Sequence, residues 1–268
     1  SGVVIKVGTG VNKVSIGDEV ILTWIECEGI DADPVKYRHN KKVINAGKVT
    51  TFSNYTIVSE NRVIKKPKKM PFDIAALYGC AFPTGAGMVI NDLSFNKHDN
   101  ILVLGLGGIG MSALIALVSK GIKNIIALDT SDEKLKIAER IGIKHTYNPK
   151  SEKINEQILK ITNKGADYCI ESAGSVKTIE LGFKLINNEG TLLFASHPDN
   201  KKKISLYPHD LIKGKKIFGS WGGSVMPDRD IPRIYKLFKK TKIPYDVLIS
   251  KQYSLKEINI AIKDLSNG

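Results

Sequence analysis

From about residue 100 onward, short apolar runs alternate with longer stretches in which apolar residues recur every three or four positions. Short apolar runs are typical of buried strands, and the longer spacing is typical of amphipathic helices. The predicted strands are 101–104, 124–128, 145–147, 167–170, 190–195 and 216–221. The predicted helices are 109–120, 132–140, 153–162, 176–185, 229–239 and 255–266. Strands that alternate with helices predict a doubly wound parallel sheet, the α/β class.

The first 66 residues follow a different pattern, in which β-branched residues and turn residues predominate. Residues 24–48 are polar and without periodicity, which predicts a loop. After Pro71 the spacing predicts a short helix capped by Asp73, followed by a second helical segment at 84–91. The predicted strands of this region are 3–7, 20–22, 50–58 and 62–65.

Composition excludes several classes of protein. The chain has 268 residues, of which 42% are hydrophobic, and this is enough for one large domain or two ordinary ones. No run of about eighteen apolar residues occurs, so we expect no membrane span and no membrane partner. With no secretion signal at the start, the scattered Cys27, Cys80 and Cys169 predict reduced thiols in a cytoplasmic protein.

The formal net charge of +13 raises the question of nucleic-acid binding. The basic residues are mostly lysines dispersed along the chain, without a clustered arginine face or an exposed aromatic set. We therefore interpret them as a solvated surface that attracts anionic substrates and cofactors, and we expect no nucleic-acid partner.

A glycine-rich segment joins the predicted strand at 101–104 to the following helix. It has the spacing of a dinucleotide-binding turn, since Gly105 permits a tight turn, Gly107 lets the backbone approach a pyrophosphate, and Gly110 allows close helix–strand packing. Gly108 and Ile109 open the helix, whose first N–H groups favour phosphate. The alternative is a plain glycine turn, which the strand before it and the helix after it disfavour.

An acidic residue, Asp129, ends the second strand of this unit. A carboxylate there accepts hydrogen bonds from the adenosine ribose and repels a 2′-phosphate, which favours NAD over NADP. Lys134, one turn into the next helix, is a candidate for a ribose or phosphate oxygen, with an ordinary surface lysine as the alternative.

Several separated motifs carry a resemblance to one family. They are Gly17-Asp18-Glu19-Val20, Thr51-Phe52-Ser53-Asn54-Tyr55-Thr56, Gly79-Cys80-Ala81-Phe82-Pro83-Thr84-Gly85, the glycine turn with Asp129, and Gly222-Gly223. In this order and spacing they resemble the zinc-dependent medium-chain alcohol dehydrogenases. The resemblance implies a partial β-rich, GroES-like catalytic domain at 1–80, a Rossmann domain at 81–222, and a return to the catalytic domain at 223–268.

The resemblance also implies roles for two residues. Cys80 corresponds to a ligand of the catalytic zinc, and Thr84 to a residue against the nicotinamide. In the family, zinc acts as a Lewis acid on an alcohol or carbonyl oxygen while the nicotinamide carries the hydride. On its own, Cys80 would be interpreted as a small buried residue.

The chain departs from the family in its metal ligands. The family's other catalytic zinc ligands precede the segment with which this chain begins, so we interpret the chain as a fragment; a variant without catalytic zinc is the alternative. Residues 24–48, where many members hold a structural zinc, contain only Cys27, so we predict no structural zinc.

The sequence thus predicts an NAD-dependent, zinc-assisted oxidoreductase that interconverts an alcohol and a carbonyl. A sugar or polyol and a simple alcohol are both compatible substrates. A zinc-free quinone or enone reductase and a non-catalytic dinucleotide-binding fragment are the alternatives. The apolar edge strand Lys216–Trp221 predicts a homodimer, alone or as a dimer of dimers.

Overall fold

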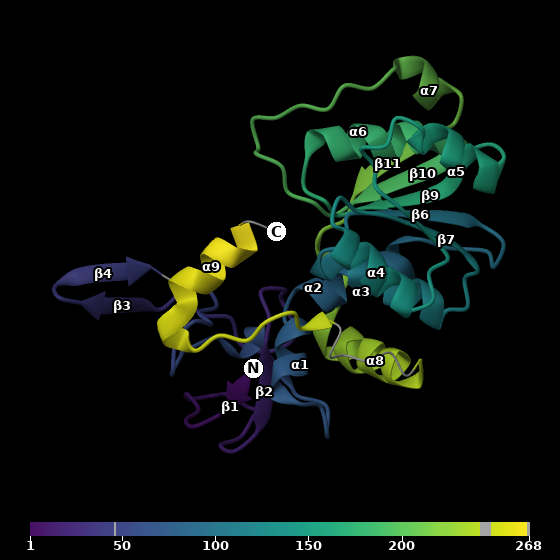
Figure 1. Ribbon diagram of the computed structural model, residues 1–268. Coiled ribbons are helices and arrows are strands. Elements are labelled where there is room, and N and C mark those ends of the chain that lie inside the picture. Colours follow the sequence, from purple (N-terminus) through teal and green to yellow (C-terminus); the bar gives the residue numbers. More distant parts are fainter. Residues whose placement is uncertain (46, 242–247, 267–268) are drawn as a thin grey trace. The chain divides into compact units, whose positions relative to one another are not determined.

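A computed structural model describes residues 1–45, 47–241 and 248–266 (Figure 1). The described residues divide into two compact units. The first contains Ser1–Cys80, Met226–Arg229 and the described part of Pro244–Gly268, and the second contains Ala81–Val225 and the described part of Asp230–Ile243.

The second unit contains a six-stranded, entirely parallel sheet in the order β11-β10-β9-β6-β7-β8 (Figure 1). The strands are β6 (Asn100–Leu104), β7 (Asn124–Leu128), β8 (His145–Tyr147), β9 (Ala166–Glu171), β10 (Ile186–Phe194) and β11 (Lys216–Gly219). The parallel sheet confirms the predicted fold class. It also places β11 at one edge, as the sequence predicts, although the strand ends at Gly219 and does not reach Trp221.

Helices precede, connect and follow these strands. They are α2 (Ala81–Gly87), α3 (Gly108–Ser119), α4 (Asp132–Arg140), α5 (Ile154–Thr162), α6 (Val176–Leu185) and α7 (Pro208–Ile212), with α8 (Pro227–Lys240) beginning in the first unit. The helix expected at 84–91 is two elements, because α2 ends at Gly87 and a π-helical turn, η2, follows at Met88–Asp92. The sequence pattern does not predict the short α7.

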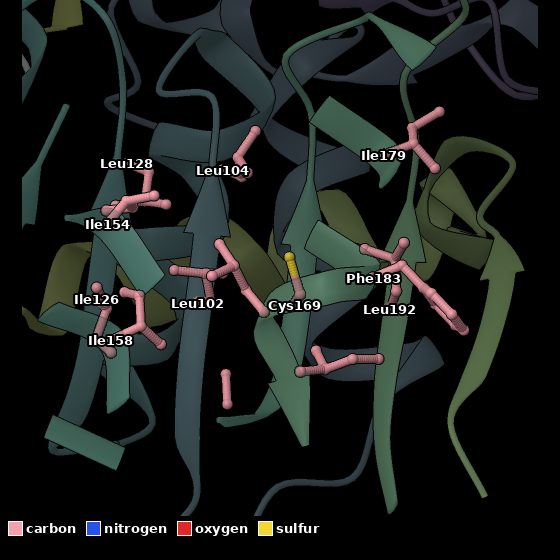
Figure 2. Close-up of a cluster of buried hydrophobic side chains, with 13 residues drawn as sticks. Leu102, Leu104, Ile126, Leu128, Ile154, Ile158, Cys169, Ile179, Phe183 and Leu192 are labelled. Atoms are coloured by element: carbon pink, nitrogen blue, oxygen red, sulfur yellow. The ribbon is translucent and has the colours of Figure 1, made fainter. Parts of the chain in front are cut away.

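The sheet is buried on both faces. The residues Ile101–Leu104 alternate in direction, yet each is at most 1% exposed, so both faces of β6 are covered. On one face, α5 and α6 pack over the sheet through Ile158 and Phe183 (Figure 2), and α3 and α4 lie on the other (Figure 1). Residues buried on both faces produce the continuous apolar runs that the sequence shows.

The first unit contains a small antiparallel sheet of β1 (Gly2–Val3), β2 (Glu19–Leu22) and β5 (Val63–Lys65). The strand expected at 3–7 is therefore only two residues long. The strand expected at 50–58 is absent from the described residues, where this segment forms bends. Phe52 and Tyr55 are 70% and 76% exposed. No described strand forms a backbone ladder with this segment, so its backbone lacks the hydrogen bonds that a strand requires.

The segment predicted as a loop at 24–48 contains a β-hairpin of β3 (Lys36–His39) and β4 (Lys42–Asn45). Its two turn residues, Asn40 and Lys41, both have positive φ, 47° and 65°, as a two-residue hairpin turn of type I′ requires. Asparagine is favoured in that conformation, so Asn40 is a local signal for the hairpin that the loop prediction overlooks.

The remaining elements of the first unit are short. They are η1 (Glu60–Arg62), α1 (Phe72–Leu77), η5 (Leu255–Glu257) and α9 (Ile258–Ser266). Asp73 does not cap α1, because the cap position is Pro71; the Asp73 carboxylate instead accepts a hydrogen bond from the Ile74 N–H inside the first turn, at 2.7 Å. No helix among the described residues is both long enough and apolar enough to cross a membrane.

Candidate functional site

The turn between β6 and α3 needs glycine at two positions for steric reasons. Gly105 has φ of 89°, and a Cβ atom there would lie 2.6 Å from the Ala173 nitrogen. A Cβ atom on Gly110 would lie 1.8 Å from the Gly105 carbonyl oxygen. Gly105 therefore allows the turn to pass close to the loop after β9, and Gly110 lets the helix pack closely against the end of the strand.

Gly107 lies in a different environment. A Cβ atom there would meet nothing within 4 Å, although the residue has an ordinary φ of −70°. Packing within the chain therefore gives no reason for glycine at this position. Helix α3 begins directly after it, and Gly108, Ile109 and Gly110 are among its first residues, whose N–H groups have no acceptor within the helix. Open space beside the N-terminus of a twelve-residue helix suits a phosphate group.

Two neighbouring strands hold this turn from opposite sides. From the end of β9, the Ser172 hydroxyl donates to the Gly105 carbonyl at 2.8 Å. From the end of β7, Asp129 accepts hydrogen bonds from the Leu106 N–H at 2.6 Å and from the Ser131 N–H at 2.8 Å. The Asp129 carboxylate is thus fixed against the glycine turn. Two oxygens offer about four acceptor positions, so it retains capacity for further donors.

Lys134 lies in the first turn of α4. Its N–H donates to the Ser131 hydroxyl, the N-cap of that helix, at 3.4 Å. The Ser131 N–H in turn donates to Asp129. Ser131 therefore links the backbone of Lys134 to the Asp129 carboxylate. Because Asp129 also binds the Leu106 N–H, the start of α4 is joined to the glycine turn.

Glu171 ends β9 and is fully buried, and sequence reasoning does not predict the hydrogen bonds that its side chain makes. Its carboxylate accepts hydrogen bonds from the N–H groups of Ala173 and Gly174 and from the hydroxyl of Thr178. The Ser196 hydroxyl donates to its other oxygen. Glu171 thereby organises the loops at the carboxyl edge of the sheet, where open α/β sheets bind ligands.

Helix α2 packs closely against the start of α3. A Cβ atom on Gly85 would lie 2.0 Å from the Ile109 carbonyl oxygen, and one on Gly87 would lie 2.3 Å from the Gly223 carbonyl oxygen. Gly223 has φ of 71° and lies against the carbonyl of Thr84, which is only 4% exposed. Helix α2 and the Gly222-Gly223 turn therefore meet in the structure, because Gly87 and Gly223 both lack a side chain at their point of contact.

Cys80 is the last residue of the first unit before Ala81, and it is exposed. The preceding Gly79 packs against β2, where a Cβ atom would lie 2.4 Å from the Leu22 carbonyl oxygen. Within the described ranges, no group of three His, Cys, Asp or Glu residues could hold a metal ion. The described residues thus provide one candidate zinc ligand and do not form a complete site.

Comparison with known proteins agrees with this geometry. The model of the alcohol dehydrogenase GroES-like domain matches residues 1–68, and the model of the zinc-binding dehydrogenase family matches residues 108–240. The crystal structure of an alcohol dehydrogenase zinc-binding domain protein from Burkholderia ambifaria is 30% identical, has a TM-score of 0.86, and is matched over 100% of this chain and 79% of its own. The chain belongs to the zinc-dependent medium-chain alcohol dehydrogenase family.

Two further members illustrate the similarity. Benzyl alcohol dehydrogenase from Acinetobacter calcoaceticus is 27% identical with a TM-score of 0.85, and the match covers 100% of this chain and 79% of the other. Alcohol dehydrogenase-like 2 from Arabidopsis thaliana is 30% identical over 224 residues, which are 82% of this chain and 58% of that protein. The chain therefore spans between 58% and 79% of the length of these relatives.

Proposed function

We propose that this protein is an NAD-dependent oxidoreductase that transfers a hydride between a small alcohol and the corresponding carbonyl compound. One observation carries the proposal. In the turn at Gly105–Gly110, neighbouring backbone leaves no room for a side chain at Gly105 or Gly110, whereas the space beside Gly107, at the start of α3, is free of protein atoms. A family member whose turn keeps this shape retains the place for a dinucleotide pyrophosphate.

The preference for NAD follows from Asp129. Its carboxylate is held in place by the N–H groups of Leu106 and Ser131 and has acceptor capacity left for ribose hydroxyls. A 2′-phosphate in the same position would meet a fixed negative charge, which costs binding free energy. Lys134 is the proposed donor to a neighbouring ribose or phosphate oxygen.

The cofactor supplies the hydride chemistry, and the chain's residues bind and orient it. The first N–H groups of α3, at Gly108 and Ile109, are the proposed phosphate donors. Thr84, on α2, is the proposed residue against the nicotinamide ring. The role of Thr84 rests on the family resemblance and on the closeness of α2 to the start of α3.

Zinc enters the proposal only through Cys80. The family uses a catalytic zinc with three protein ligands and an open position. The described residues offer Cys80 alone, which is too few ligands for such a site, so the roles assigned to this chain do not depend on the metal. We propose Cys80 as one ligand, which predicts that metal content falls when its thiol is removed.

The test is a coupled measurement of binding and turnover on the purified chain. We expect NADH to bind even in the presence of a chelator. If NAD is reduced with simple or aromatic alcohols, that turnover should be reduced by chelators and by Cys80→Ser. Failure to bind any dinucleotide would refute the proposal. Binding without turnover would favour the non-catalytic alternative, and reduction of enones that is insensitive to chelators would favour the zinc-free reductase.

We also propose that the protein forms a homodimer through the edge strand β11 and the residues after it, Lys216–Trp221. Phe218 is 40% exposed and Trp221 is 71% exposed, with the Trp221 ring in edge-on contact with His197. Such an edge favours pairing with a second copy across a two-fold axis. Phe218→Lys should give a monomer in size-exclusion chromatography with light scattering, while Lys216→Gln should not. A wild-type chain that is monomeric at high micromolar concentration would contradict the proposal.

A further inference from the structure

The second unit contains an open cavity of about 350 Å³ that the glycine turn does not use. It lies between the end of α3, the turn η2 and the part of α8 that belongs to this unit. Its lining residues are Ile90, Lys120, Arg233, Lys236, Leu237 and Lys240. Two apolar residues and four basic residues therefore line the cavity, and none of the lining residues is acidic.

The basic residues converge from two helices. Arg233, Lys236 and Lys240 are three and four positions apart on α8, so they lie on one face of that helix. Lys120 comes from the end of α3. The pKa of Lys120 lies below its ordinary value, first because of burial and second because of the positive charge of Arg233. The two cations are thus close enough to repel one another.

Existing partners account for part of this charge. Arg233 lies 3.8 Å from the buried carboxylate of Asp230, and the Lys120 ammonium lies 3.5 Å from the Val89 carbonyl oxygen. Cations at helix C-termini also stabilise the helix dipole, which explains Lys120 and Lys240 individually. This explanation does not extend to Lys236, which lies before the last turn of α8, or to the convergence of all four around one cavity.

The cavity is separate from the proposed dinucleotide site. The glycine turn lies at the N-terminus of α3 and Lys120 lies at its C-terminus, twelve residues later. At about 1.5 Å per residue, the two ends are roughly 18 Å apart. A ligand in the cavity would therefore be additional to the cofactor.

We propose that this cavity binds a compact, multiply charged anion of the phosphate class, separately from the cofactor. Such an anion would accept charge-assisted hydrogen bonds from several of the four cations and relieve the repulsion between Lys120 and Arg233. A fully apolar ligand would leave these charges uncompensated, and a single carboxylate would neutralise only one of them.

The test uses inorganic tripolyphosphate as the probe and the full chain at low ionic strength, with binding measured by isothermal titration calorimetry. With saturating NADH present to occupy the glycine turn, the wild-type chain should bind one equivalent. Lys120→Glu/Lys236→Glu should weaken binding by about tenfold or more, since each reversal replaces an attraction with a repulsion. The control Lys202→Glu/Lys203→Glu makes the same change in net charge at exposed residues of the same unit and should change binding by less than about twofold.

A second comparison locates the site. Gly107→Asp places an acid at the N-terminus of α3, where phosphate would otherwise bind, and should leave tripolyphosphate binding unchanged. If the reversal variant fails to fold by circular dichroism, Lys120→Gln/Lys236→Gln replaces it, with an expected loss of about threefold or more. Absence of wild-type binding, equal loss in the control, or loss in Gly107→Asp equal to that in the cavity variant would each overturn the proposal.

Discussion

The two units are stabilised by different kinds of contact. In the second unit, the central strands carry apolar side chains on both faces, and Leu102, Ile126, Cys169 and Leu192 are fully buried in one cluster (Figure 2). In the first unit, one cluster consists of the buried valines Val14, Val20 and Val63, and Ile21, Ile64, Met70 and Tyr78 are buried as well.

In addition, hydrogen bonds and ion pairs of charged side chains hold the loops of the first unit. The Glu60 carboxylate accepts hydrogen bonds from the N–H groups of Asn12, Lys13 and Ile30. The Arg62 guanidinium donates to the Trp24 carbonyl and to Glu26. Lys13 pairs with Asp228 at 2.7 Å and approaches the Cys27 sulfur at 3.2 Å. These contacts join loops that are distant in sequence, without requiring a metal.

The difference also explains which parts of the fold are predictable. Strands Asn124–Leu128 and His145–Tyr147 and helices Asp132–Arg140 and Val176–Leu185 are found with the predicted bounds, because apolar periodicity and capping are local signals. The segment 50–58 has the composition of a strand, but a strand also needs a second strand to pair with. The sequence of the segment itself does not show whether such a partner is present.

The same distinction applies to the site. The spacing of Gly105, Gly107 and Gly110 is a local signal, and in the structure Gly105 and Gly110 are closely packed while Gly107 borders open space. The hydrogen bond from Ser172 to Gly105 and the network around Glu171 join residues from different strands. Such contacts emerge only when the order of the strands is known.

The largest effect is expected from a change at the glycine turn. Gly110→Ala places a methyl group 1.8 Å from the Gly105 carbonyl oxygen, and Gly105 is held in place by hydrogen bonds to Leu128 and Ser172. We expect a loss of at least about 3 kcal/mol in the stability of the second unit. Its melting temperature should fall by roughly 6–12 °C, and dinucleotide binding should be lost.

The matched control is Gly107→Ala, where the added methyl group meets nothing within 4 Å. Its stability should stay within about 1 kcal/mol of wild type, while dinucleotide binding weakens. Thermal unfolding by calorimetry and NADH titration separate the two variants. Equal loss of stability in both would show that packing does not distinguish these glycines.

An intermediate effect is expected from acid in the first unit. Hydrogen bonds from the Ile30, Lys13 and Asn12 N–H groups lower the pKa of Glu60 below its ordinary value of 4.5. A carboxyl whose pKa is lower when folded stabilises the unit fully above the unfolded pKa, and this contribution disappears as the pH falls through the folded pKa. Stability of the first unit should therefore decline as the pH falls below about 4.5.

Glu60→Gln should reduce stability at neutral pH and flatten the decline in acid. The exposed Glu152→Gln, in the second unit, should change neither. Urea unfolding as a function of pH, followed in the first unit by Trp24 fluorescence in a Trp221→Phe background, measures both. An unchanged pH profile in Glu60→Gln would show that this carboxylate does not hold the loops.

The smallest effect is expected when a chelator is added, because we predict no structural zinc in the region of the hairpin β3–β4. Strands β3 and β4 pair through their backbones, Tyr37 accepts a hydrogen bond from the Ile57 N–H, and Lys48 pairs with Asp31 at 2.9 Å. A chelator should change the stability of the first unit by less than about 0.5 kcal/mol. Metal analysis that finds two tightly held zinc ions per chain, or a chelator-induced drop in melting temperature, would contradict this account.

The most direct test of the central claim, a site for NAD at the glycine turn beside Asp129, is a fluorescence titration of one preparation with NADH and with NADPH. We predict that NADH binds at least about tenfold more tightly, which corresponds to roughly 1.4 kcal/mol and is within the value of one hydrogen bond to a charged group. Asp129→Gly should remove most of that difference. Equal or tighter binding of NADPH by the wild-type protein would contradict the account.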